Sequence, residues 1–261
     1  MKKFYILFLL GVLLPVNILT AQDNIKWNVE KSTHFIVSYK KADADFIRRL
    51  ISYAEDYYNK IADELGFRRY DFWLWDNRAK IYIYDDSKDY LSSTGQPAWS
   101  SGYANVREKM ISTYPYAEGF FETILPHEMG HIIFREFVGF YNTAVPVWLD
   151  EGVASYQENG RYEKAYRVIK NAIEGGSFIP LEELSGLSPQ FLLDREAVNL
   201  FYSEAVGIIH YLIKEFGKDN FVALCQRLRD KGNLEEAVRS SYPFKNIQEL
   251  GKRWEEYLRS H

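Results

Sequence analysis

The sequence has almost no cysteine: Cys225 is the single such residue in 261. One cysteine cannot form a disulfide within the chain, so a small disulfide-stapled fold is excluded. Cys225 ends the apolar stretch 221–225, and this setting predicts a buried free thiol that packs as a small hydrophobic residue. Glycine and proline are also few, with 16 and 8 residues, and no linker-like run, repeat or low-complexity segment divides the chain.

An excess of basic residues is also missing. The 32 Lys plus Arg residues are outnumbered by 36 Asp plus Glu, which gives a formal net charge of -4. A dedicated nucleic-acid-binding protein normally carries a basic patch, so this balance predicts no nucleic-acid partner. The composition is 47% hydrophobic and 16% aromatic, which is typical of a globular chain long enough to bury a core.

The marked apolar run at the start of the chain, residues 4–14, is short for a membrane span. It follows Lys2 and Lys3, and the small residue Ala21 precedes polar Gln22. This pattern is typical of a secretory signal peptide. We therefore expect cleavage after Ala21, export to the periplasm or the exterior, and no stable membrane insertion of the mature chain. An uncleaved membrane anchor is the alternative.

The mature chain, residues 22–261, is predicted to be one α+β domain in which strands come first and helices later. Alternating apolar residues and strand formers indicate strands, and apolar residues at helical spacing indicate helices. The expected strands are 34–39, 81–84 and 102–114, and the first expected helix is 46–65, ending at Gly66. From about residue 117 nearly all of the chain is predicted to be helical, including 200–216, 221–228 and 247–258.

The residues most suited to chemistry form the sequence His127-Glu128-Met129-Gly130-His131. Two histidines four residues apart on a helix are offset by about 40°, so both imidazoles face one point. In this H-E-x-x-H arrangement the two histidines hold a zinc ion, Zn2+, and Glu128 serves as the general base. Pro126 marks either the start of the helix or a tolerated kink. The alternative for the whole motif is a chance match with two core histidines.

A catalytic zinc site takes three protein ligands and leaves one position open. Glu151 follows His131 by 20 residues, in the segment 146–154. This gap fits the end of one helix, a turn near residues 139–143 and a second helix that starts near Pro146. Glu151 is therefore the candidate third ligand, with Asp150 as its rival and a solvated helix charge as the remaining interpretation.

Small residues follow Glu151, and we expect Gly152 and Ala154 to let the two metal-binding helices approach closely. The remaining histidines lack ligand spacing and are predicted to be structural or surface residues: His34, His210 and His261. Of these, His210 could instead line the cleft.

H-E-x-x-H followed by W-L-x-E-G-x-A resembles the gluzincin metallopeptidases, in particular the peptidase MA-like group. In those families the Glu of the E-G pair is the third zinc ligand, which maps onto Glu151 and not Asp150. The resemblance implies a zincin-like fold, with a small mixed sheet whose edge strand lies beside the H-E-x-x-H helix, and one catalytic domain over residues 22–261. It covers most of the mature chain, because further short segments are also similar: 97–102, 179–184 and 202–217.

The resemblance also implies an activity, namely hydrolysis of a peptide or protein substrate by a zinc-activated water with Glu128 as base. Tyr202 resembles the tyrosine that the family carries one helix further on, which implies that it stabilises the developing oxyanion. The alternative is a packing role, since the chain has 20 tyrosines.

One departure from the family bears on the kind of cleavage. The aminopeptidase branch carries G-x-M-E-N on its edge strand, where the Glu captures the free amine of the substrate. The corresponding segment here, residues 102–108, lacks that pattern. We therefore expect endopeptidase-like cleavage of extended peptides paired with an edge strand at 102–113. Aromatic residues could line its pockets or only pack the sheet: Trp99, Tyr103 and Tyr114.

Two other functions remain as alternatives. A catalytically idle zincin domain could bind peptide or glycan as an interaction module, but such a module does not need the base that Glu128 supplies. A hydrolase of another amide, such as a cell-wall crosslink, would use the same residues.

Overall fold

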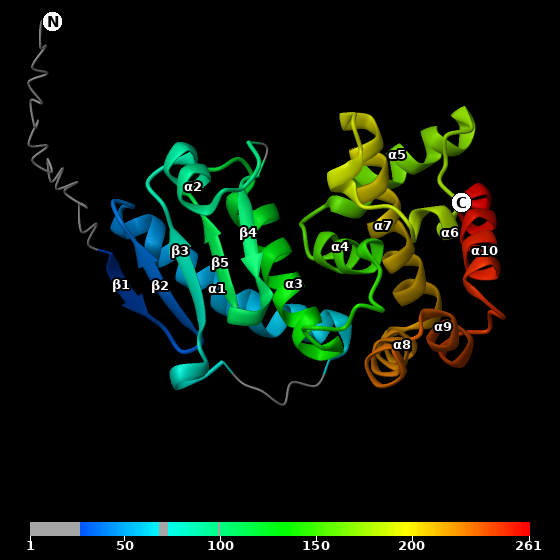
Figure 1. The fold of residues 1–261 in the computed structure, drawn as a ribbon, viewed down its shortest axis with the longest axis horizontal. Helices are drawn as coiled ribbons and strands as arrows, with labels where there is room; N and C mark the ends of the chain where they lie inside the picture. The colour runs from blue at the N-terminus through cyan, green and yellow to red at the C-terminus, as the bar shows by residue number, and fades with distance from the viewer. Residues whose placement is uncertain (1–26, 68–72, 99) are drawn as a thin grey trace, which may run out of the picture.

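The structure, a computed structural model, describes residues 27–67, 73–98 and 100–261. The expected signal segment, 1–21, and Trp99 lie outside the described residues. A sheet-bearing part and a helical part lie side by side, with the chain passing from the first to the second (Figure 1). Within the three described ranges, no helix combines the length and the apolar character that a membrane crossing requires.

The sheet has five strands in the order β1-β2-β3-β5-β4. The three inner strands are parallel to one another, while each outer strand is antiparallel to its neighbour, so the sheet is mixed, as predicted. Strand β4 forms the edge that faces the helical part (Figure 1). The strands are β1 (Asn28–Lys31), β2 (Phe35–Tyr39), β3 (Ala79–Ile83), β4 (Gly102–Asn105) and β5 (Met110–Thr113).

The prediction of a single strand over 102–114 is wrong, because this segment folds as the hairpin β4–β5. The Asn105 side chain accepts a hydrogen bond from the Glu108 backbone N–H, and Lys109 has a left-handed backbone with φ of 48°, which together reverse the chain. Of these two strands, only β4 lies at an edge of the sheet. Strand β1 was not predicted, because its four residues are all exposed and show no apolar alternation.

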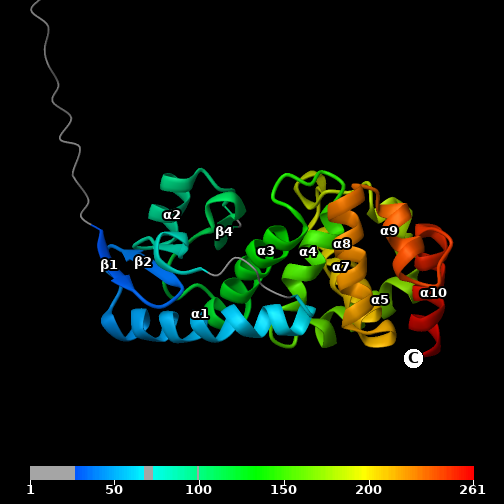
Figure 2. The ribbon, with the colours of Figure 1, turned by 90° about the horizontal axis from the view of Figure 1, so that it is seen from below.

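Helices make up most of the rest of the fold. The predicted first helix and the helical character after about residue 117 are confirmed, whereas the helix Ser87–Thr94 was not predicted. Helix α1 runs along one side of the sheet (Figure 2) and packs against α3, while α7 lies at the centre of the helical part between α4, α5 and α8. The helices are α1 (Ala44–Leu65), α2 (Ser87–Thr94), α3 (Leu125–Val138), α4 (Val147–Tyr156), α5 (Arg161–Gly175), α6 (Leu181–Leu184), α7 (Arg195–Phe216), α8 (Lys218–Lys231), α9 (Leu234–Ser241) and α10 (Ile247–Ser260).

Helix α3, which carries H-E-x-x-H, begins at Leu125 and follows directly on a π-helical turn, Phe120–Ile124. Pro126 lies in the first turn of α3, where a missing backbone N–H costs little. Pro126 therefore marks the start of the helix and is not a kink within it. The motif then lies two residues inside a regular helix, which fixes both histidines on one side.

Close packing of α3, α4 and α7 depends on small residues. A Cβ atom on Gly130 of α3 would lie 3.0 Å from the Cα of Ala154 in α4, so Ala154 does allow the two helices to approach. A Cβ on Gly152 would lie 2.4 Å from the carbonyl oxygen of Ala205 in α7. The prediction that Gly152 faces α3 is therefore wrong. Residues two apart on a helix are turned by about 200° and face opposite neighbours.

Glu204 of α7 is a carboxylic acid buried in the helical part. Its side chain is 0% exposed; Oε1 accepts a hydrogen bond from the Ile179 N–H, and Oε2 has no partner among the described residues. Burial raises the pKa of Glu204 to about 8. The folded protein therefore holds a proton there that the unfolded chain releases above its ordinary pKa of 4.5.

This difference predicts how stability changes with pH. Because the folded pKa is the higher one, the contribution of Glu204 to the free energy of unfolding is fully present below about pH 4.5. It is lost as pH rises toward about 8, by about 1.4 kcal/mol per pH unit at most. Glu204→Gln keeps the size and the acceptor of the side chain, and it should remove this slope. Urea unfolding at pH 5, 6, 7 and 8 measures the difference, with exposed Glu196→Gln of the same helix as control. Parallel curves for native protein and Glu204→Gln would contradict the prediction.

Candidate metal centre and catalytic cleft

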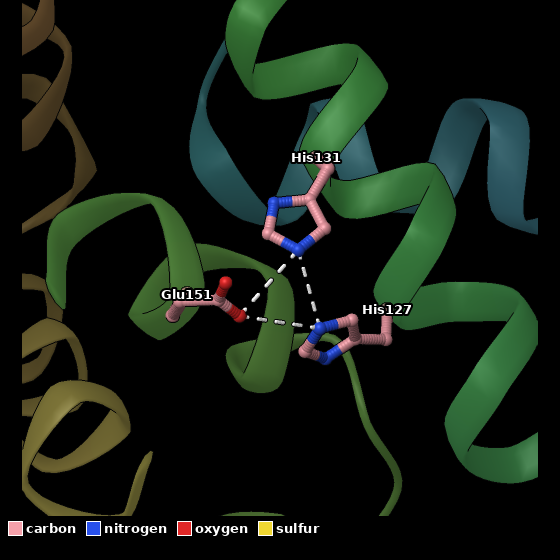
Figure 3. Close-up of side chains that lie close together, drawn as sticks. All are labelled: His127, His131 and Glu151. Carbon is pink, nitrogen blue, oxygen red and sulfur yellow. Dashed lines mark hydrogen bonds and ion pairs between the residues drawn. The ribbon is translucent and has the colours of Figure 1, made fainter. Parts of the chain in front are cut away.

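Three side chains from two helices meet at one point between α3 and α4 (Figure 3). The Nε2 atoms of His127 and His131 lie 3.2 Å apart. Oε2 of Glu151 lies 3.5 Å from the first nitrogen and 3.6 Å from the second. The structure therefore brings together the three residues that the sequence selected as metal ligands, with one donor atom from each.

Each of these histidines also has a carboxylate on the other side of its ring. Nδ1 of His127 lies 2.8 Å from Oε1 of Glu158, and Nδ1 of His131 lies 3.0 Å from Oδ1 of Asp150. A carboxylate at Nδ1 holds the proton on that nitrogen and leaves the Nε2 lone pair free. Asp150 thus contacts the nitrogen that faces away from the central point, and there Arg135 also binds it.

The donor set fits a divalent cation. Two Nε2 atoms and one carboxylate oxygen converge, and imidazole nitrogen with carboxylate oxygen is a ligand set of zinc. Burial lowers the pKa of His127. Hydrogen bonds with Glu151 and Glu158 raise the pKa by more than burial lowers it, and the net pKa is about 9. The site thus attracts positive charge, which either protons or a metal ion could supply.

Glu128 lies beside the three ligands and points into the same cavity. Burial raises the pKa of its carboxyl group, while the two nearby histidines lower it, and the balance is a raised value. The backbone of Ala104 in β4 lies beside this carboxyl group and also lowers its pKa. A Cβ on Gly102 would lie 3.0 Å from Oε1 of Glu128, so a residue without a side chain lets β4 pass this close.

These groups line an open cavity of about 700 Å³ between β4 and the helical part. Tyr202 of α7 lies in its wall with Glu128 and the three candidate ligands. Burial, and then the negative charges of Glu151 and Glu128, raise the pKa of Tyr202 above its ordinary value. Its phenol therefore keeps its proton at neutral pH and can donate a hydrogen bond.

The other residues considered from the sequence are placed differently. Tyr103 lines the cavity, whereas Tyr114 packs on Tyr90 and its hydroxyl donates to Ser101. The three remaining histidines have structural surroundings outside the described cavity wall: His34 pairs with Glu55, His210 stacks on Tyr162 and His261 stacks on Tyr257. The idea that His210 lines the cleft is therefore wrong.

Glu158 was missed from the sequence, although a signal was available. It follows Glu151 by seven residues, which is close to two helical turns, so both carboxylates lie on one side of α4 and its end. The role of Asp150 as the partner of His131 was also missed, because it was considered only as a ligand.

Removing the charge of Glu158 should weaken metal binding without removing a ligand. We expect Glu158→Gln to lower zinc affinity by ~10- to 100-fold, because the neutral amide orients and polarises His127 less strongly. Competition with a chromogenic chelator measures the affinity, and exposed Glu163→Gln is the matched control. Unchanged affinity in Glu158→Gln would show that this carboxylate does not support His127.

Comparison with known proteins points to one family. The family model described as the peptidase MA superfamily matches residues 74–260. Among solved structures, yeast LTA4 hydrolase in complex with bestatin is similar at 13% sequence identity and a TM-score of 0.48. The similarity covers 90% of this chain but 37% of that one, so the chain spans little more than a third of that structure. No curated protein matches the sequence.

Proposed function

The chain belongs to the peptidase MA superfamily, and from this premise we propose that it is a zinc-dependent metallopeptidase that cleaves internal bonds of extended peptides. The observation that carries the proposal is the convergence of His127, His131 and Glu151 on one point with Glu128 beside them, in an open cavity. The intact base favours an enzyme over a module that only binds peptide or glycan.

The residues of the cavity divide the chemistry among them. Zinc bound by the three ligands would polarise the carbonyl of the substrate and lower the pKa of a water molecule. Glu128 takes the proton of the attacking water and passes it to the leaving amine.

Tyr202 is proposed to donate a hydrogen bond to the oxyanion that forms on the former carbonyl oxygen. Tyr202→Phe should therefore lower kcat by ~100-fold or more with little effect on zinc content. Steady-state kinetics on one cleaved peptide measures the effect, and Tyr166→Phe, outside the cavity wall, is the control. A native kcat in Tyr202→Phe would reduce Tyr202 to a packing residue.

Strand β4 offers a binding edge for an extended peptide. One side of β4 pairs with β5, and its other side borders the cavity, where Tyr103 and Ala104 form part of the wall. A peptide can add to such an edge through its backbone, which predicts broad sequence preference.

The acids of the cavity wall argue for internal cleavage. They are Glu128, Asp150 and Glu151, and each is already assigned to the base, to His131 or to the metal. None of the described acids in the wall is thus left to capture a free amino terminus. A panel of paired free and N-acetylated peptides tests this: both members of each pair should be cut at internal bonds. Stepwise release of single residues from the free forms alone would establish an aminopeptidase.

Export and a single catalytic domain over residues 22–261 form part of the same proposal. Mass spectrometry of the mature protein tests the export part of the proposal, and we expect a chain that begins after Ala21. An intact Met1 in the membrane fraction would instead support an anchor.

A further inference from the structure

Two exposed side chains meet in the wall of the cavity, away from the metal-binding residues. Arg107 lies in the short 3-10 turn Val106–Glu108, which directly follows β4. Tyr141 lies in the connection between α3 and α4. Both line the cavity that contains Glu128, and the guanidinium carbon of Arg107 lies 4.2 Å from the centre of the Tyr141 ring.

The stacking leaves Arg107 able to bind a ligand. Tyr141 is 73% exposed, so the pair is open to solvent and not part of the core. A guanidinium that stacks on an aromatic ring is held by its flat face, while its N–H groups point outward in the plane. That arrangement suits a carboxylate, which accepts two parallel hydrogen bonds from one guanidinium.

The charges of the cavity single out Arg107. The other arginine in the wall, Arg135, donates to both the Asp150 carboxylate and the carbonyl oxygen of Asn142, so its charge is already compensated. Arg107 forms no ion pair with any carboxylate among the described residues. It is thus a cationic group in the wall that is available to a negatively charged ligand.

We propose that Arg107, oriented by Tyr141, binds a carboxylate of the substrate and gives the cleft a preference for acidic peptides. The inference rests on the proposed function, because it places the peptide along β4. A chain paired with β4 that continues past Asn105 reaches the turn that carries Arg107. The carboxylate could belong to an Asp or Glu side chain or to the C-terminus of a short peptide.

Binding and cleavage can be tested separately with one set of peptides. In the first arm, the peptides have an amidated C-terminus and carry either Glu or Gln at each position in turn, so they differ only in a side-chain carboxylate. In the second arm, the Gln peptide is compared with a free and with an amidated C-terminus, so the two forms differ only in the terminal carboxylate. Calorimetry on zinc-loaded Glu128→Gln protein measures affinity without cleavage. We expect at least ~10-fold tighter binding at one Glu position or for the free acid, as for a charge-assisted hydrogen bond. Which arm shows the gain identifies the source of the carboxylate.

Substitution of the pair then tests the residues. The quantity compared is the affinity for the peptide with the carboxylate divided by the affinity for its matched peptide without it. Arg107→Gln in the Glu128→Gln background should bring this ratio close to one, and Arg107→Lys should retain part of the preference. Tyr141→Phe, which keeps the ring, should preserve the ratio, whereas Tyr141→Ala should reduce it. Exposed Arg167→Gln on α5 is the control for loss of one positive charge.

The outcomes separate this inference from the proposed function. An unchanged ratio in Arg107→Gln, or no ratio in the parent protein, would overturn the inference even if the native protein cleaves the peptides. A ratio that depends on Arg107 in a protein that cleaves none of them would support the carboxylate site and overturn the proposed peptidase activity.

Discussion

Glu128→Gln is expected to keep the fold and the zinc but to lose at least ~100-fold in peptide hydrolysis. The amide has nearly the same shape and can occupy the same place beside the backbone of Ala104. It cannot take a proton from water at neutral pH, so the step assigned to Glu128 fails. Because Glu128 is not one of the three converging ligands, zinc content should stay near one per chain.

Turnover of one peptide, measured together with elemental zinc on the same sample, checks this expectation. Glu122→Gln, an exposed glutamate ahead of α3, is the matched control and should behave as the native protein does. Equal turnover by Glu128→Gln and native protein would remove Glu128 from the mechanism.

His131→Ala should lose both the zinc and the hydrolysis. It removes one of three donor atoms and leaves two protein ligands, too few for the three that a catalytic zinc site uses. The fold should tolerate the change, because Asp150 remains paired with Arg135 when its histidine partner is absent. We expect zinc to fall from near one per chain to near zero.

Elemental analysis of protein purified without added metal measures this loss. His210→Ala is a suitable control, since it removes an imidazole that stacks on Tyr162 outside the cavity wall. Circular dichroism of both variants checks the fold. Full zinc occupancy in His131→Ala would show that the ligand assignment is wrong.

The sequence predicted those parts of the fold and site that depend on residues close together in the chain. The spacing of His127 and His131 needs only a helix, and Gly66 ends α1 with φ of 75°, as a helix-terminating glycine often does. The prediction of a small mixed sheet followed by helices is also confirmed. In these cases the periodicity of one segment decides the outcome.

Other features depend on contacts between distant segments, and here the sequence was less informative. The reversal at Asn105 and Lys109 splits an apparent strand into a hairpin, because a short turn interrupts a run of strand formers. Gly152 faces α7 because the helical part packs around α7, which no pattern within α4 reveals. The meeting of Arg107 with Tyr141 depends on how the β4–β5 hairpin lies beside the α3–α4 connection.

The central claim, that the three-ligand site with Glu128 makes this chain a metal-dependent peptidase, is tested most directly by digestion of a broad peptide library. Mass spectrometry would identify the cleaved bonds for protein as purified, after removal of metal with a chelator, and after one equivalent of zinc is restored. The account predicts internal cleavage that is lost with the metal and returns with zinc. Cleavage that persists in the metal-free protein, or no cleavage of any peptide by the zinc-loaded protein, would contradict it.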